Sequence, residues 1–212
     1  MQTRRTVLAT AGAALLGAAS TSMAETLRRT PTQVLGPFYP IDKPLDSDAD
    51  MTQVRGRRGR AQGQVVHVMG RVLNAKGEPV AGARIEIWQA NHFGRYSHPS
   101  DQNPAPLDPD FEGYANLTSD AQGNYRFKTI KPAAYPFDGG MRAPHIHFDV
   151  TGRVNRLVTQ MYFPGERLND DDIVIAVARS NGKLLIADVR PPTPDLERDA
   201  LLALWNIVLE NG

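Results

Sequence analysis

The chain has 212 residues, with 24 Lys and Arg against 23 Asp and Glu, and it contains no cysteine. This length allows one sizeable hydrophobic core but leaves little for a second domain. The nearly balanced charge gives no sign of a nucleic-acid partner or of an anionic membrane surface. Disulfides and thiolate metal sites are excluded, so a metal ion would have to be held by His, Tyr, Asp or Glu.

The N-terminus has the pattern of an export signal. Paired arginines at Arg4 and Arg5 precede an Ala/Leu/Gly run that ends near Ala19, and Ser22-Met23-Ala24 is a small-x-small cleavage site. Paired arginines are typical of the twin-arginine route, which is an address and not a membrane anchor. We therefore expect residues 1–24 to be removed and the protein to be exported, to the bacterial periplasm. The alternative is an N-terminal helix that is never cleaved.

Residues 25–63 predict an irregular N-terminal arm, because they are rich in Pro, Asp and Arg and show little periodicity. Within this arm, Leu35-Gly36-Pro37-Phe38-Tyr39-Pro40 is a compact aromatic turn. We expect this apolar cluster to dock on the core or on the rim of a pocket. The basic run at residues 55–60 is interpreted as a solvated loop and not as a binding patch.

Residues 64–212 have the pattern of an all-β domain. Short segments rich in β-branched residues are separated by Gly/Asn/Asp turns, without long helices between them, which favours an antiparallel β-sandwich with long loops. Residues 196–209 have helical spacing and Asp195 stands at the N-cap position, so a short C-terminal helix is predicted. The expected strands cover residues 65–73, 84–88, 125–129, 146–151, 157–163, 173–178 and 184–189.

Two loops are unusual. Residues 91–114 form a long segment without a strand or helix pattern, and such loops beyond about 12 to 15 residues are usually functional in compact domains. Residues 130–140 form a second loop, stiffened by proline, that delivers Tyr135 shortly before Arg142. Both loops are therefore candidates to build an active site.

The stretch from Arg142 to Phe148 contains two histidines on one expected strand. His145 and His147 are two residues apart, so both imidazoles leave the same face of the strand about 7 Å apart along the backbone. This spacing suits a metal site, and Arg142 would place a permanent cation at its rim. The alternative is a strand whose histidines make ordinary hydrogen bonds, and for this pair alone that alternative is the more common one.

Tyr96 and Tyr135 lie on the two long loops and would join the two histidines if both loops fold over the end of that strand. Two phenolates and two imidazoles form a hard, anionic set of ligands, which favours a trivalent oxidised metal such as ferric iron over zinc. Each tyrosine alone could instead be a packed aromatic side chain with a hydrogen-bonded hydroxyl.

Several blocks of sequence together resemble the intradiol ring-cleavage dioxygenases, and in particular the iron-binding subunit of the protocatechuate 3,4-dioxygenases. The resemblance runs from about Gln33 to Ala176. Its blocks are Gly36-Pro37-Phe38-Tyr39, Ile87-Trp88-Gln89-Ala90-Asn91, Gly94-Arg95-Tyr96, Thr129-Ile130-Lys131-Pro132, Tyr135-Pro136, Arg142, Pro144-His145-Ile146-His147-Phe148 and Thr159-Gln160-Met161-Tyr162-Phe163.

The resemblance implies an Fe(III) enzyme that uses O2 to cleave a catechol between its two hydroxyl-bearing carbons, giving a cis,cis-muconic acid type product. It implies that each chain holds one Fe(III), through Tyr96, Tyr135, His145 and His147, and that Tyr135 leaves the metal when the catechol chelates it. Arg142 is the implied catalytic cation that faces the bound ring. The implied substrate-binding residues are Gln160, Trp88, Tyr39 and Phe137, the last of which stands where the similar relatives have a tryptophan.

Two other functions remain open from the sequence. The first is a non-catalytic β-sandwich subunit that keeps the fold and binds a partner, and the second is a structural module that holds zinc. The enzyme itself could work as a homo-oligomer or as a hetero-oligomer. A tyrosinate–Fe(III) protein would be burgundy, whereas a zinc module or a metal-free subunit would be colourless.

Overall fold

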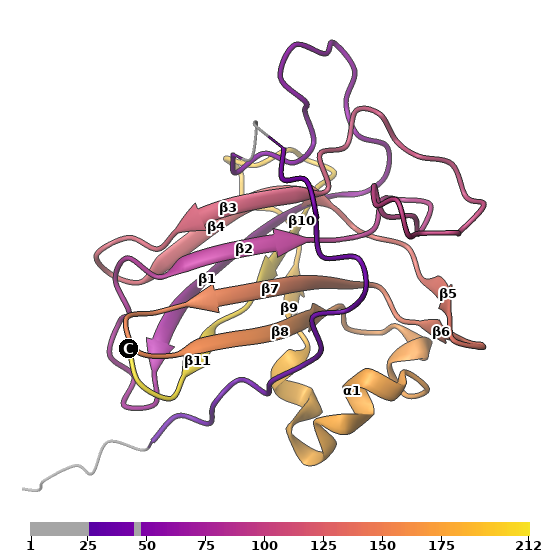
Figure 1. Cartoon of the computed structure of the whole chain (residues 1–212). Coiled ribbons are helices and arrows are strands. Elements are labelled where there is room, and N and C mark those ends of the chain that lie inside the picture. The colour runs from indigo at the N-terminus through magenta and orange to yellow at the C-terminus, as the bar shows by residue number, and fades with distance from the viewer. Residues whose placement is uncertain (1–25, 45–47) are drawn as a thin grey trace, which may run out of the picture.

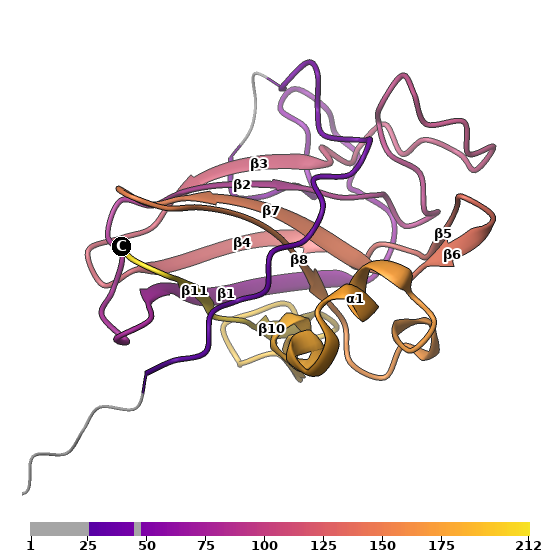
Figure 2. The same cartoon turned by 60° about the horizontal axis from the view of Figure 1, so that its bottom comes forward.

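The computed structural model of the chain describes residues 26–44 and 48–212, and it shows two β-sheets packed face to face (Figures 1 and 2). The first sheet contains β1 (Val65–Asn74), β4 (Asn124–Ile130), β9 (Asp188–Arg190), β10 (Leu201–Leu204) and β11 (Ile207–Leu209), and the second has the order β3 (Tyr114–Thr118), β2 (Arg84–Trp88), β7 (His145–Thr151), β8 (Arg156–Tyr162). A hairpin of β5 (Tyr135–Phe137) and β6 (Gly140–Arg142) stands apart from both sheets. The helices are α1 (Ile173–Val177) and the 3-10 helices η1 (Arg167–Asn169) and η2 (Arg179–Leu185).

The main hydrophobic core lies between the two sheets. On β7, Ile146, Phe148 and Val150 alternate with polar residues and point into this core, and all three are fully buried. The ring of Phe148 packs against Phe127 of β4, with ring centroids 5.9 Å apart, and against Trp205, at 5.0 Å. The prediction of a β-sandwich is therefore confirmed.

The predicted C-terminal helix is wrong. Residues 201–204 and 207–209 form β10 and β11, and both pair with β1 in parallel, so the first sheet is mixed and not purely antiparallel. The backbone N–H and C=O groups of this segment pair with the free edge of β1, and this tertiary pairing overrides the helical spacing of its apolar residues. Gly70 allows the join, because a Cβ atom there would lie 1.7 Å from the backbone oxygen of Trp205.

The strands expected at residues 65–73, 84–88, 125–129, 146–151 and 157–163 are confirmed within two residues at each end. The strand expected at residues 173–178 is wrong, since this segment is α1, and its start is capped by the Asp172 carboxylate, which accepts hydrogen bonds from two backbone N–H groups. The strand expected at residues 184–189 is confirmed only at its end, where β9 begins at Asp188, because residues 184 and 185 are the last two of η2.

The described part of the N-terminal arm is irregular, as predicted, and it crosses the outer face of the second sheet (Figure 1). The backbone N–H of Gln33 donates to the carbonyl oxygen of Val158 at 2.8 Å, and the side chain of Gln160 donates to the carbonyl oxygen of Val34 at 3.0 Å. The basic run at residues 55–60 lies in an exposed loop. The predicted export signal falls outside the described residues. Within the described ranges, no helix combines the length and apolar character that a bilayer span requires.

Candidate active site

Strand β7 brings the two histidines together on the outer face of the second sheet. The Nε2 atoms of His145 and His147 are 3.1 Å apart, and both side chains are buried. Nδ1 of His145 lies 2.6 Å from the carbonyl oxygen of Ala143. A carbonyl oxygen can only accept, so Nδ1 carries the proton and Nε2 keeps a lone pair that can bind a metal.

The sheet register holds His147 between two residues predicted to contact substrate. Trp88 of β2 and Gln160 of β8 are its direct cross-strand neighbours. The indole of Trp88 stacks on the imidazole of His147, with ring centroids 4.8 Å apart and an interplanar angle of 11°. This stacking fixes the plane of the ring, so the strand pairing and the aromatic contact together set the direction of Nε2.

Tyr135 reaches the site on the β5–β6 hairpin, a segment that was predicted to be a loop stiffened by proline. The hairpin turns at Asp138 and Gly139, whose φ angles of 48° and 76° are those of a two-residue turn with left-handed residues. The Asp-Gly dipeptide was the signal for it. Tyr135 pairs directly with Arg142 across the hairpin, and its hydroxyl lies 3.4 Å from Nε2 of His145.

Tyr96 reaches the site on the long loop between β2 and β3. Its backbone N–H donates to the Asp101 carboxylate at 2.7 Å, while the side chain of Asn91 accepts from two backbone N–H groups of the same loop. The ring of Tyr96 lies edge-on to that of Tyr135, with centroids 5.4 Å apart. Its buried hydroxyl has no hydrogen-bond partner among the described residues. A buried polar atom without a partner is costly, so this oxygen is a candidate to bind a ligand or an ion.

Aromatic side chains enclose the four residues. The predicted aromatic turn of the arm does dock here: the ring of Phe38 packs against Tyr96 at 4.7 Å, and Tyr39 meets Trp88 edge-on at 5.0 Å. The hydroxyl of Tyr39 donates to the buried carboxylate of Glu86 at 2.5 Å. Phe137 packs on the same cluster from the end of β5. Under this cover the four side chains are almost completely buried.

Arg142 is buried beside the site and is held on two sides. Its Nε donates to the Asp172 carboxylate at 2.9 Å, and its Nη2 donates to the Gln160 side-chain oxygen at 2.7 Å and to the Tyr162 hydroxyl at 3.1 Å. All residues predicted for the site thus lie in one region. Asp101, Tyr162 and Asp172 were not predicted to belong to the site, and only Tyr162 lies inside one of the sequence blocks that resemble the family.

The pKa values follow from burial. Burial lowers the pKa of His145, and the Arg142 cation lowers it further; for His147, burial acts first and His145 second. Both rings are therefore neutral near pH 7, which is the form that binds metal ions. Burial raises the pKa of the Tyr96 and Tyr135 phenols above the ordinary value, so each would need a bound cation to ionise.

The residues present fit a metal ion with mixed phenol and imidazole ligands. Two Nε2 atoms face each other, one phenol oxygen lies close to them, and a second phenol oxygen is buried without a partner. Within residues 26–44 and 48–212, no three His, Asp or Glu side chains gather closely enough to hold a metal. The described residues therefore do not offer zinc its usual His and carboxylate site.

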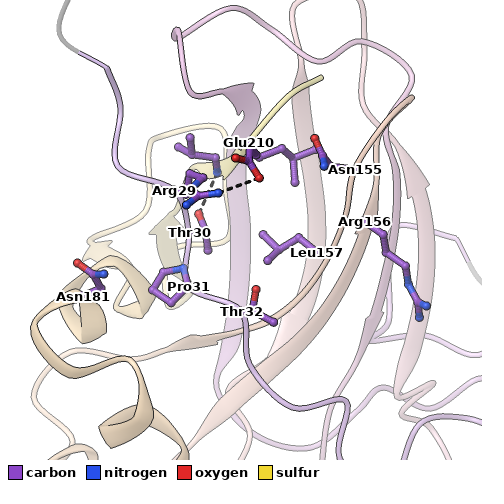
Figure 3. A pocket seen from close by; sticks show the side chains of 11 residues that line it. Arg29, Thr30, Pro31, Thr32, Asn155, Arg156, Leu157, Asn181 and Glu210 are labelled. Atoms are coloured by element: carbon purple, nitrogen blue, oxygen red, sulfur yellow. Dashed lines mark hydrogen bonds and ion pairs between the residues drawn. The ribbon is translucent and has the colours of Figure 1, made fainter.

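A pocket of about 330 Å³ lies away from these residues, between the arm, β8 and the C-terminal segment (Figure 3). Arg29 and Glu210, which both line this pocket, form an ion pair with 2.8 Å between the charged atoms. Thr30 holds the arm to β11, since its backbone N–H donates to the carbonyl oxygen of Val208 at 3.0 Å. None of the residues predicted for function lines this pocket.

Comparison with known proteins identifies the family of this chain. Residues 34–211 match the family profile Dioxygenase_C, described as Dioxygenase. The chain is 39% identical over 176 residues to the protocatechuate 3,4-dioxygenase beta chain of Burkholderia cepacia, covering 81% of this chain and 68% of that protein. It is 33% identical over 162 residues to catechol 1,2-dioxygenase 2 of Acinetobacter lwoffii, covering 69% of this chain and 56% of that protein.

A solved structure shares the fold. The dioxygenase domain of a dioxygenase carbohydrate-binding protein fusion from Streptomyces sp. SirexAA-E superposes with a TM-score of 0.67 at 24% identity, covering 87% of this chain and all of that one. This likeness shows that the chain has the same β-sandwich fold. The chain belongs to the intradiol ring-cleavage dioxygenase family.

Gly94 offers a test of how the two tyrosine loops meet. Its φ angle is +79°, and a Cβ atom there would lie 2.5 Å from the carbonyl oxygen of Ala134, next to Tyr135. Gly82 has a similar φ of +72° but open space around it. We expect Gly82→Ala to lower the free energy of unfolding by roughly 1–2 kcal/mol, from backbone strain alone. Gly94→Ala should cost roughly 3 kcal/mol or more, because a clash is added.

The measurement is urea unfolding of both variants, followed by tryptophan fluorescence. Equal losses for the two variants would mean that the loop at Ala134 yields freely, and would contradict a rigid contact between the loops.

Proposed function

We propose that the chain is an Fe(III)-dependent intradiol dioxygenase. It would cleave the ring of a protocatechuate-like or otherwise substituted catechol between its two hydroxyl-bearing carbons, with both atoms of O2 entering a cis,cis-muconic acid type product. The observation that carries this proposal is the convergence of two phenols and two imidazoles in a buried aromatic site, with the Nε2 atoms of His145 and His147 3.1 Å apart.

Tyr96, Tyr135, His145 and His147 would hold one ferric ion per chain. Ferric iron, when bound, would ionise the two phenols and draw electron density from a chelating diol, so that O2 can attack the ring. The chain prepares both imidazoles for this role, because burial keeps them neutral and the Ala143 carbonyl fixes the tautomer of His145. The aromatic side chains from the arm and from β5 would limit the access of water to the site.

Tyr135 and Arg142 carry the remaining chemistry that the chain can supply. The Tyr135 oxygen, once ionised, would accept a proton from an incoming catechol hydroxyl, since the diol must lose both protons to chelate. The Arg142 guanidinium would stabilise negative charge that develops on the ring, as a fixed cation in a site closed to bulk water. Gln160, Trp88 and Tyr39 would line the space for the ring, and Phe137 would border its substituent.

Two specific observations argue against the other functions. A non-catalytic subunit would not need a buried Arg142 beside four side chains that are candidate metal ligands. A zinc module would use carboxylate or thiolate, and the chain has no cysteine. The relative named as a beta chain supports an oligomer, either of this chain alone or with a second subunit.

The iron-loaded protein should be burgundy and should consume O2 when a catechol is added. A panel of catechol, protocatechuate, hydroxyquinol and chlorinated or alkylated catechols would identify the substrate.

Tyr96→Phe should lose most of the visible colour, because it removes a phenolate ligand. Tyr125→Phe is the matched control, since the Tyr125 hydroxyl donates to the Trp205 carbonyl oxygen at 2.7 Å inside the core. A colourless wild-type protein that consumes no O2 with any catechol would refute the proposed function.

Arg142→Leu should keep its iron and its colour but lose turnover by a factor of roughly 100 to 1,000, the usual cost of removing a charge-stabilising group. Arg153→Leu, which changes an exposed arginine in the turn after β7, should leave turnover unchanged. Steady-state O2 consumption at saturating catechol measures both variants. Near-normal turnover in Arg142→Leu would remove Arg142 from the mechanism.

Export to the periplasm by the twin-arginine route is part of the proposal and is supported by the pattern of residues 1–24 alone. We expect the periplasmic protein of an expressing bacterium to begin at Glu25, by intact mass. Replacing Arg4 and Arg5 by lysine should leave uncleaved protein in the cytoplasm. Unchanged processing of that variant would argue against the twin-arginine route.

A further inference from the structure

Asp172 joins the catalytic region to a short helix that lies outside the sandwich. It is fully buried, and it immediately precedes α1. Its Oδ1 atom accepts from the backbone N–H groups of Val174, at 2.9 Å, and Ile175, at 3.3 Å. Its Oδ2 atom accepts from Nε of Arg142, at 2.9 Å, and from the backbone N–H of Ala143, at 2.8 Å. Each oxygen of the carboxylate therefore holds a different part of the chain.

The opposite side of Arg142 is held as well. Nη2 donates to the side-chain oxygen of Gln160 and to the hydroxyl of Tyr162, and that hydroxyl in turn donates to the same Gln160 oxygen at 2.8 Å. Hydrogen bonds at both Nε and Nη2 restrain the orientation of the guanidinium plane and keep the side chain from turning toward solvent.

We propose that Asp172 is a positioning residue for Arg142, which orients the guanidinium toward the bound ring and balances its charge. This inference rests on the proposed function, in which Arg142 stabilises charge on the ring. A preorganised cation acts only if it does not have to move when charge develops. The Asp172 carboxylate can supply that rigidity because three backbone N–H groups, from Ala143, Val174 and Ile175, already fix its two oxygens.

The simplest competing explanation is that Asp172 only caps α1. Asp172→Asn separates the two roles, because an Asn side chain caps helices as well as Asp does. Its oxygen can still accept from Val174 and Ile175, but its NH2 group would then face the Nε–H of Arg142 and the N–H of Ala143, where an acceptor is needed. Asp172→Ser is a second variant, in which the hydroxyl can cap α1 but the side chain lacks the second oxygen atom.

Asp120→Asn is the matched control away from the site. The Asp120 carboxylate accepts from the backbone N–H groups of Gln122, at 2.9 Å, and Asn124, at 2.7 Å, so the same change is made at an acceptor of two backbone N–H groups in the exposed turn between β3 and β4. We expect this control to behave like the wild type in turnover.

The experiment uses the iron-loaded full chain and measures turnover and catechol binding separately. We expect Asp172→Asn to keep the visible colour and to bind catechol without O2 within about threefold of wild type, while turnover falls about tenfold or more. In an Arg142→Leu background, adding Asp172→Asn should change the single-turnover rate by less than about twofold, because the group on which Asp172 acts is absent.

A readout independent of activity is the NMR signal of the Arg142 Nε–H group, recorded on the metal-free protein. In the wild type this proton should exchange slowly with water, because it is buried and bound to a carboxylate; in Asp172→Asn and Asp172→Ser it should exchange rapidly. The proposal is overturned if the exchange is unchanged, or if Asp172→Asn slows turnover by the same factor with and without Arg142. Failure of the proposed function would give a different result from failure of this inference, because the wild-type protein itself would then consume no O2 with any catechol.

Discussion

The burial of both faces of β7 is the constraint on which the rest of the structure depends. One face carries Ile146, Phe148 and Val150 into the core, and the other carries His145 and His147 toward the arm and the loops. Pairing with β8 fixes the position of both histidines along the strand, and pairing with β2 also fixes that of His147. Because the outer face is covered as well, the two rings are removed from water and stay neutral, which makes them ready to bind a metal ion.

The cover over that outer face is built by three segments that are far apart in the sequence. The arm is tied to β8 through Gln33, the long loop is organised by Asn91 and Asp101, and the β5–β6 hairpin turns at its Asp-Gly pair. None of these anchoring residues is a candidate metal ligand, yet each determines the position of a tyrosine hydroxyl or of an aromatic side chain that covers the site. A site of this kind therefore depends on loop anchors as much as on the residues that would touch the metal.

Local patterns were sufficient for much of the fold and failed where long-range pairing decided the outcome. The alternation of apolar and polar residues, together with the turn residues, located the strands on either side of His145 and His147. Each of these strands has one apolar face, so apolar residues recur at every second position. Residues 201–209 were wrongly assigned to a helix, since their apolar residues fit the spacing of a helix as well as that of a strand. They form strands because they pair with the free edge of β1. Residues 173–177 became a helix because the Asp172 carboxylate caps it from a buried position.

The sequence by itself determined which chemistry was available: two imidazoles on one face of a strand, two tyrosines on long loops, a nearby arginine and no thiol. These follow from residue type and from the two-residue period of a strand, which are local properties. Only the tertiary structure decided that both tyrosine loops fold over the same strand, and that Asp172 grips Arg142 from 30 residues away. Contacts of this kind depend on burial and on hydrogen bonds between distant segments, and no local pattern in the chain encodes them.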